Sequence, residues 1–310
     1  MIGGGSKRVA PLLVLLLAAR CASAGRPASS EIDRALAAAS IRCACRMGVA
    51  AKHLESGLSY EHLADAEFEG ASVTKIAVLT EAMATAREGG IDLEGRWTLT
   101  ETDKADGSGL LLLLNPGLAP TWSDLLTLMI GPSDNTATNA WIERLGLDAI
   151  NARMETLGFH RIRLLGTLPP YSRHNEIPSA WKGFRFGTLT PREVALWYER
   201  VARGELLDAE SSRKIFAYLD KDPSRLRAAR RFPSGDLWAG KTGTMSGVRN
   251  DSGILRTKKG RFVLVLLTDG GAVSRSNPAD NPATLAIADV AQTIVEAWSR
   301  ELPDLVEKPE

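Results

Sequence analysis

Three short motifs rich in hydroxyl and amine side chains occur in one order along this 310-residue chain. A serine hydroxyl is a weak nucleophile at neutral pH, but a nearby lysine can activate it if burial and cationic neighbours lower the pKa of that lysine. A serine and a lysine three residues apart on a helix share one face, so the first motif predicts nucleophilic acyl transfer. The motifs are Ser72-Val-Thr-Lys75, Ser133-Asp134-Asn135 and Lys241-Thr242-Gly243.

The first motif alone is weak evidence. The chain contains two further Ser-x-x-Lys matches, which start at Ser179 and Ser211, as chance allows for so short a pattern. An isolated serine at the position of Ser72 is also most often a helix N-cap. All three motifs in order are far less probable by chance, so we interpret Ser72 as the nucleophile.

The trio is the signature of class A β-lactamases and penicillin-binding proteins, and the sequence around it is similar to that superfamily as well. The similarity extends from about Arg46 to about Trp298. The chain therefore resembles a class A β-lactamase-like serine hydrolase, which acts on cyclic amide bonds and would open β-lactam rings. The flanking segments that carry the similarity are Leu128–Asn139, Thr190-Pro-Arg192 and Lys241–Asp251.

The resemblance assigns roles to the first two motifs. Lys75 would deprotonate Ser72, and Ser133 would relay a proton to the leaving nitrogen. Asn135 would hold the amide carbonyl of the substrate, whereas we interpret Asp134 as structural.

The third motif would bind the substrate. Lys241 would attract a substrate carboxylate and depress the pKa of Lys75, while Thr242 adds a hydroxyl donor. Gly243 would allow a close backbone approach. By resemblance, Arg249 is a second candidate for the carboxylate; if Lys241 and Arg249 were exposed, they would only form a solvated face.

The resemblance also implies an oxyanion hole. The backbone N–H groups of Ser72 and Thr244 are the expected donors, and each such donor contributes about 3 kcal/mol of transition-state stabilisation.

One part of the family pattern is missing. Class A β-lactamases hydrolyse the acyl-enzyme with a glutamate in a Glu-x-x-Leu-Asn loop, and this chain has no such pattern. Alignment by Asn175 places Tyr171 at the glutamate and His174 at the leucine. Glu176 follows and could substitute, although a lone loop glutamate is usually a surface residue.

The missing glutamate leaves three functions open. The first is a β-lactamase. The second is a D-alanyl-D-alanine peptidase, amidase or esterase that uses the same acylation residues on a peptidoglycan-like substrate. The third is a penicillin-binding sensor whose acyl-enzyme persists.

The chain begins with a predicted secretory signal over residues 1–24. Lys7 and Arg8 precede the apolar run Val9–Ala19, and Ala22-Ser23-Ala24 is a small-residue cleavage site. The run is too short to span a membrane, so we expect a periplasmic or extracellular protein without stable membrane insertion. A lipoprotein acylated at Cys21 is the alternative, but Arg20 fits that signal poorly.

Charge and composition limit the partners. Removal of the signal takes away three cations and no acid, so 38 basic against 37 acidic residues become 35 against 37, a net charge near −2. This balance does not favour nucleic acid. Neither the four histidines nor Cys43 and Cys45 have metal-ligand spacing, so we predict no cofactor and no metal. We expect a monomer.

Cys43 and Cys45, if they share one strand, would lie on one face about 7 Å apart, at the upper limit for a disulfide. We therefore expect the fold not to depend on disulfides.

Hydrophobic periodicity and turn residues predict the elements. Thr121 and Thr190 are expected helix caps, each followed three residues later by an acid that completes a capping box. Helices are expected at 72–90, 121–130, 135–145, 148–157, 190–204 and 282–298, and strands at 46–52, 58–63, 237–243, 249–256 and 261–268.

This order predicts a two-lobed α/β (α+β) fold. An antiparallel sheet would combine N- and C-terminal segments, with flanking helices and an all-helical lobe. Residues 41–300 would form the catalytic domain, after a mature N-terminal segment at 25–40 whose first part, Gly25 to Ile32, we interpret as a tether. Residues 301–310 would form a charged tail.

Overall fold

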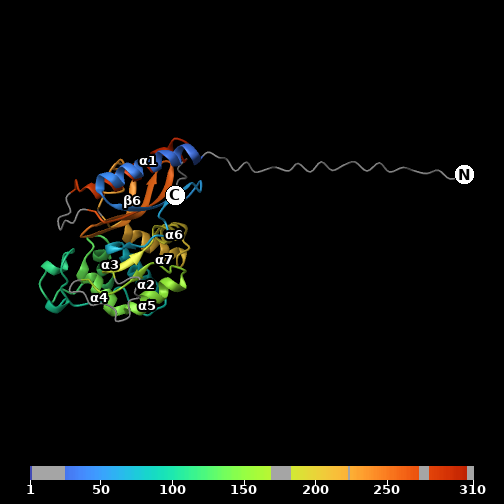
Figure 1. Ribbon diagram of the computed structural model, residues 1–310. Coiled ribbons are helices and arrows are strands. Elements are labelled where there is room, and N and C mark those ends of the chain that lie inside the picture. Colours follow the sequence, from blue (N-terminus) through green and yellow to red (C-terminus); the bar gives the residue numbers. More distant parts are fainter. Residues whose placement is uncertain (2–24, 169–182, 223, 272–278, 306–310) are drawn as a thin grey trace.

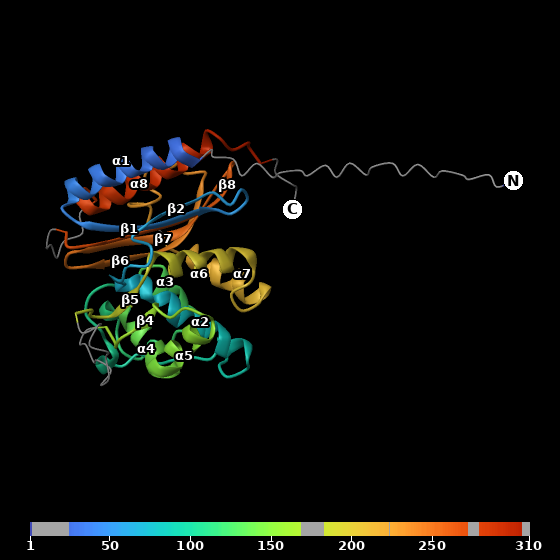
Figure 2. The same ribbon diagram turned by 45° about the vertical axis from the view of Figure 1, so that its right-hand side comes forward.

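The computed structural model describes Met1 and residues 25–168, 183–222, 224–271 and 279–305 (Figure 1). The predicted signal sequence at 2–24 therefore lies outside the described residues. The chain is built in layers, with two helices over one face of a sheet and a helical lobe against the other (Figure 2).

The main sheet is antiparallel and has five strands in the order β2-β1-β8-β7-β6. N-terminal β1 pairs with C-terminal β8 from Arg46↔Asp269 to His53↔Phe262. The predicted sheet from the two chain ends is thus confirmed. Its strands are β1 (Arg46–His53), β2 (Ser59–His62), β6 (Leu237–Met245), β7 (Val248–Thr257) and β8 (Gly260–Asp269).

The outer face of the sheet is covered by α1 (Gly25–Cys43) and α8 (Pro282–Ser299) (Figure 2). The interpretation of Gly25 to Ile32 as a tether was wrong, because this segment is the first part of α1. The small residues there suggested a loop, but Ile32 and Leu36 lie one turn apart and are both buried in the core beneath α8.

Cys43 and Cys45 do not share a strand, so that premise was wrong as well. Cys43 ends α1, Cys45 precedes β1, and Ala44 between them has a left-handed φ of 47°. The turn brings the two Cα atoms to 5.1 Å, and the cysteines form a disulfide. The bond closes so short a loop that its effect on unfolded-chain entropy is small.

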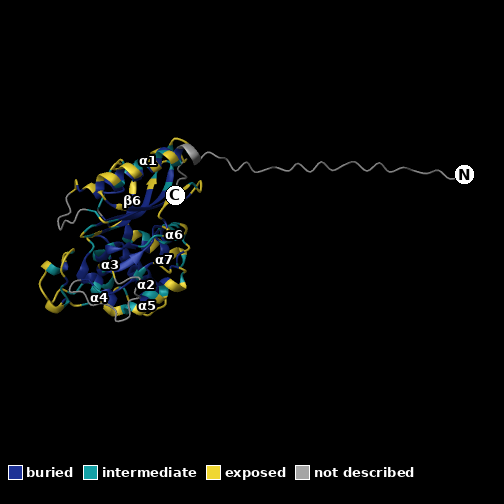
Figure 3. Cartoon of the chain, viewed as in Figure 1, coloured by how far each residue is buried: buried dark blue, intermediate teal, exposed yellow. Residues whose placement is uncertain are grey.

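The inner face of the sheet packs on the helical lobe. Successive residues of β7 face two different cores. Leu255 belongs to the core with α1 and α8, whereas Ile254 belongs to the core shared with the helical lobe. Figure 3 shows buried residues along the sheet and inside the lobe, and exposed residues on the outer side of α1. The lobe contains α2 (Lys75–Arg87), α3 (Trp122–Ile130), α4 (Asn135–Leu145), α5 (Leu147–Thr156), α6 (Pro191–Arg203) and α7 (Ala209–Leu219).

The helix caps explain why these elements start where predicted. Thr121 accepts from Asp124 N, with the reciprocal bond of a capping box. Thr190 accepts from Glu193 N, but the Glu193 carboxylate does not return to the cap as predicted. It instead accepts from the backbone N–H groups of residues 160–162 and so satisfies the donors of that turn. Helix α7, capped by Asp208, was not predicted.

A small sheet connects the lobes and was also not predicted, because strands of two or three residues show no period. Its order is β3-β5-β4, formed by Phe68–Glu69, Gly187–Leu189 and Arg163–Leu164. Gly70 N donates to Gly187 O at 2.8 Å, so this sheet holds the start of the first motif. Within the described residues, no helix combines the length and apolar character needed to cross a membrane.

Candidate active site

Ser72 lies in a one-turn 3-10 helix, η1 (Ala71–Thr74), which leads directly into α2. Ala71 before it has a left-handed φ of 45°, a strained conformation for a residue with a Cβ. The N-cap interpretation fails here, because Gly70 caps η1 and Thr74 caps α2. Ser72 is half-buried, so its hydroxyl sits at the edge of the interior.

Lys75 brings the first two motifs together. Its Nζ donates to Ser133 O at 2.7 Å, to Ser133 Oγ at 3.1 Å and to Asn135 Oδ1 at 3.1 Å. The side chain is fully buried. Burial first, and the charge of Lys241 second, lower the pKa of Lys75 well below its usual value, against an opposing effect of Asp134. This shift moves Lys75 toward its neutral amine form, and a neutral amine can accept a proton.

The second motif is a strained turn at the start of α4. Ser133 has a φ of 60°, and Asp134 caps α4 by accepting from Ala137 N at 2.9 Å. The other oxygen of Asp134 accepts from the backbone N–H groups of Leu110 and Leu111 at 2.6 and 2.8 Å. The structural role predicted for Asp134 is confirmed.

A glycine-rich loop that we did not assign to the site packs on this turn. Asn135 Nδ2 donates to Asp106 O at 2.7 Å, and Ser108 Oγ donates to Ser133 O at 2.7 Å. A Cβ on Gly107 would lie 2.7 Å from Asn135 Nδ2, and one on Gly109 would lie 2.4 Å from Asp134. The two glycines are the only sequence signal that could have indicated this contact.

The third motif lies on β6, the edge strand next to Ser72. A Cβ on Gly243 would come 2.9 Å from Gly70 O and 3.2 Å from Ala71 Cβ, so only glycine fits without a shift. The close approach predicted for Gly243 is present. It brings the backbone of Thr244 beside the turn that carries Ser72.

Lys241 is buried, so the solvated-face alternative is wrong for this residue. Its Nζ donates to Thr242 O at 3.2 Å. Burial lowers the pKa of Lys241, while the nearby charge of Asp222 opposes that shift. Asp222 also accepts from Thr242 N at 3.3 Å, which ties the carboxylate to the motif strand.

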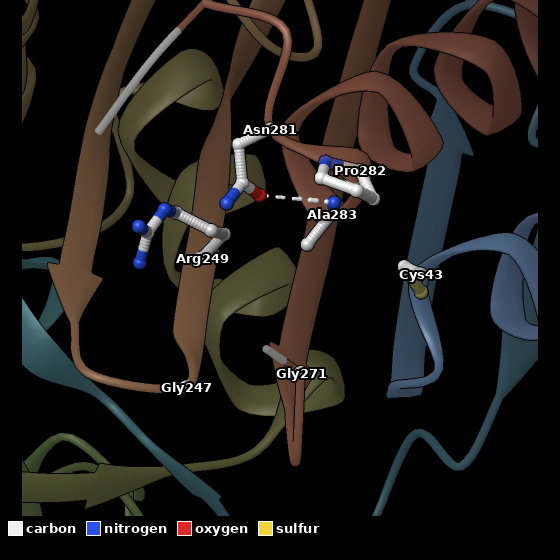
Figure 4. A pocket seen from close by; sticks show the side chains of 7 residues that line it. All are labelled: Cys43, Gly247, Arg249, Gly271, Asn281, Pro282 and Ala283. Atoms are coloured by element: carbon white, nitrogen blue, oxygen red, sulfur yellow. Dashed lines mark hydrogen bonds between the residues drawn. The ribbon is translucent and has the colours of Figure 1, made fainter. Parts of the chain in front are cut away.

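Arg249 is buried too, but it points elsewhere. Arg249 lines a small pocket beside the start of α8, together with Cys43, Asn281 and Ala283, but its guanidinium extends away from them (Figure 4). Its Nη1 donates to the backbone carbonyls of Met245 and Val248, at 2.8 and 2.7 Å. The structure thus does not bring Arg249 into the hydrogen-bond cluster of Lys75 and Ser133, and its substrate role remains a prediction.

Arg227 is a residue that sequence reasoning missed. Its guanidinium is buried and donates to Gly243 O at 2.8 Å and to the hydroxyl of Thr244. Burial lowers the pKa of Arg227 to about 10, so it is still a cation at neutral pH. No local motif marks Arg227, because it reaches β6 from a turn far from the strand in sequence.

The loop after the second motif starts at a fixed point. Asn139, one turn after Asn135 on α4, accepts from Leu168 N at 2.9 Å and donates to Leu168 O at 3.2 Å. Leu168 is buried. The loop residues singled out in the sequence, Tyr171, Asn175 and Glu176, lie outside the described residues. No group of three or more His, Cys, Asp or Glu side chains that could hold a metal lies within the described ranges.

Comparison with known proteins agrees with this geometry. A profile of the β-lactamase enzyme family matches residues 27–298. The β-lactamase of Streptomyces albus G is 28% identical over 283 residues, which cover 88% of this chain and 86% of the relative. The solved β-lactamase of Sphaerobacter thermophilus is 30% identical with a TM-score of 0.75, over 88% of this chain and 99% of that one.

A third match has the same fold at lower identity. It is a PBP-A variant with a leucine-to-glutamate substitution, solved as an acyl-enzyme with penicillin G. The two chains are 23% identical, and they superpose with a TM-score of 0.74 over 87% of this chain and 97% of that one. The extent of the family match shows that the chain belongs to the β-lactamase enzyme family. It is a serine hydrolase of the class A β-lactamase type.

Proposed function

We propose that this protein opens β-lactam rings by transfer of the acyl group to Ser72, and that the slow step is release of that group. The observation that carries the first half is the buried Lys75 amine, held between Ser133 and Asn135. Neutral Lys75 takes the proton of Ser72 as Ser72 Oγ bonds to the carbonyl carbon. Ser133 passes a proton to the ring nitrogen as the C–N bond breaks, and is reprotonated by Lys75.

The same cleft supplies substrate contacts. Backbone N–H groups of Ser72 and Thr244 would stabilise the oxyanion. Lys241 and Arg227, two buried cations on either side of Thr242 to Thr244, would bind the substrate carboxylate. We include Arg227 because its guanidinium contacts the Thr244 hydroxyl, whereas the guanidinium of Arg249 donates to the backbone carbonyls of Met245 and Val248.

Deacylation depends on the residue at the start of the loop after β4. Asn139 lies one turn from Asn135 on the same face of α4 and hydrogen-bonds to the backbone of Leu168, so an apolar residue stands beside α4 where this loop begins. We propose that Leu168, rather than Tyr171, occupies the place of the missing glutamate. The PBP-A variant of the same fold, which carries glutamate in place of a leucine, was solved as an acyl-enzyme with penicillin G.

A second candidate function follows from Leu168. If no loop acid activates water, the acylation residues would serve a D-alanyl-D-alanine peptidase, amidase or esterase, whose acyl group passes to another acceptor. A penicillin-binding sensor would retain the group. These alternatives differ from a β-lactamase only in the fate of the acyl-enzyme.

Incubation with excess benzylpenicillin, followed by intact mass over time, separates these functions. An adduct that appears and clears while penicilloate accumulates supports a β-lactamase. A persistent adduct supports the peptidase or sensor. Ser72→Ala must abolish the adduct, whereas Ser211→Ala, at the start of a chance Ser-x-x-Lys match on α7, must retain it; an adduct on Ser72→Ala would contradict the proposal.

We also propose that the protein is exported and acts as a monomer outside the cytoplasm, without stable insertion into a membrane. The predicted signal sequence at 1–24 supports export. Mass determination of the secreted chain and its elution volume would test both points.

A further inference from the structure

A second pocket lies away from the Ser72 site, between the end of α6, the first half of α7 and the β7–β8 hairpin. Its volume is about 280 Å³, and none of the residues that line it belongs to the Ser72 site. Four arginines contribute to the lining, and we call this site the arginine pocket: Arg203, Arg213, Arg256 and Arg261.

Two of these arginines face each other across the hairpin. Arg256 on β7 is directly opposite Arg261 on β8 in the register. Both lie on the inner side of the sheet, in step with Ile254 and Val263 of the core shared with the lobe. Like charges directly opposite each other destabilise an antiparallel pair. An anion between them would remove that repulsion.

The neighbouring carboxylates only partly balance this charge. Arg261 Nε donates to Glu55 Oε1 at 2.7 Å, and Arg203 Nε donates to Glu199 Oε1 at 3.1 Å. Glu199 is shared with Lys52, whose Nζ lies 2.7 Å from the same oxygen. Two carboxylates, Glu55 and Glu199, are therefore shared among the three cations Arg261, Arg203 and Lys52.

The other two arginines make no close ion pair, although Arg213 has a carboxylate neighbour in Glu210 on the same helix, whose pKa is lowered by Lys214 first and by Arg213 as well. Within the parts of the chain that the structure describes, no carboxylate lies within 4 Å of Arg213 or Arg256. Both side chains are exposed at the mouth of the pocket, so they can reach a ligand. Among the described residues, the four arginines and Lys52 thus make ion pairs with only two carboxylates, Glu55 and Glu199.

We propose that the arginine pocket binds a phosphate-bearing anion. Guanidinium groups donate in a planar fork that matches the oxygens of phosphate, and several forks around one pocket favour a ligand with more than one negative charge. The volume is slightly below the roughly 300–1,000 Å³ of small-molecule sites, which suits a group as small as phosphate or pyrophosphate. A bound group would connect α6 and α7 to the β7–β8 hairpin and stabilise the fold.

The test is calorimetric titration of the mature protein with inorganic pyrophosphate at constant ionic strength. Arg256→Ser and Arg213→Ser should each raise the dissociation constant at least about tenfold, the loss expected for a hydrogen bond between charged groups. Arg34→Ser, which removes an exposed arginine on α1, is the control for net charge. Benzylpenicillin acylation should be unchanged in all three variants, which shows that they are folded.

A second arm identifies the source of the phosphate. Sedimentation with vesicles that contain phosphatidylglycerol tests a lipid headgroup, and binding there that depends on Arg256 supports a membrane source for the same site. Absence of binding to both probes would overturn the proposal. Equal weakening by Arg34→Ser would overturn it too, since it would mean nonspecific attraction.

Discussion

The cleft has two sides: an acylation side, formed by the three motifs, and a loop side, where the loop after Leu168 begins. They differ in how many polar side chains they place at the site. On the acylation side, Lys75, Ser133 and Asn135 form one hydrogen-bonded cluster, and Lys241 lies close enough to lower the pKa of Lys75. On the loop side, Asn139 holds the apolar Leu168. Under the proposed function, formation and release of an acyl group depend on different residues, so a chain could keep one set while it changes the other.

The largest effect should come from removal of the base. Lys75→Met should slow acylation by benzylpenicillin by roughly 10²–10⁴-fold, the usual contribution of a positioned general base. The buried site should accept an apolar side chain, so the melting temperature should change little. Rapid acylation in a folded Lys75→Met protein would show that another group activates Ser72.

The loop side can be tested by a gain of function. Leu168→Glu should shorten the lifetime of the penicilloyl adduct by on the order of 10²-fold, because a carboxylate at this point can activate water. Leu168→Gln is the matched control, with similar size and polarity but no base. If glutamate and glutamine act alike, Leu168 does not stand at the deacylation position.

Two buried arginines, Arg227 and Arg249, are the alternative candidates for binding the substrate carboxylate. Arg227→Ser should raise the KM for benzylpenicillin by about 10–100-fold, through loss of a charge-assisted contact with the substrate carboxylate. Arg249→Ser should leave KM nearly unchanged, because that guanidinium is engaged by the backbone carbonyls of Met245 and Val248. The reverse result would restore the role that the sequence suggested for Arg249. Steady-state or acylation kinetics on both variants would decide this.

The smallest effect concerns pH. The lowered pKa of Lys75 means that acylation should remain fast below the usual lysine range and decline as pH falls through that lowered pKa. Lys241→Met removes the charge repulsion between Lys241 and Lys75, so the pKa of Lys75 should rise. The acid limb of the profile of acylation rate against pH should therefore move to higher pH. The shape of the pH profile, rather than its height, measures this, since Lys241 also binds substrate.

The same shift affects stability. Below its usual pKa the unfolded chain protonates Lys75 while the folded protein resists it, so the unfolded state binds more protons. The free energy of unfolding should therefore rise with pH between the lowered pKa and about 10.5, the usual value. Lys75→Met should remove that slope, as chemical denaturation at several pH values would show.

Local signals in the sequence determined much of this protein. The three motifs indicated the family, the capping residues Thr121 and Thr190 set helix starts, and Lys258 and Lys259 form the turn between two strands that the sequence predicted, β7 and β8. Such features depend on residues a few positions apart, which interact in any chain with that sequence.

Only the tertiary structure decided the rest. The contact of Lys75 with Ser133, the position of Arg227 against Thr244 and the clamp of Asn139 on Leu168 join segments far apart in the chain. The lowered pKa of Lys75 needs both burial and the neighbouring charge of Lys241, which no local pattern contains. Residue types therefore set the possible chemistry, whereas desolvation and long-range contacts decide which groups perform it.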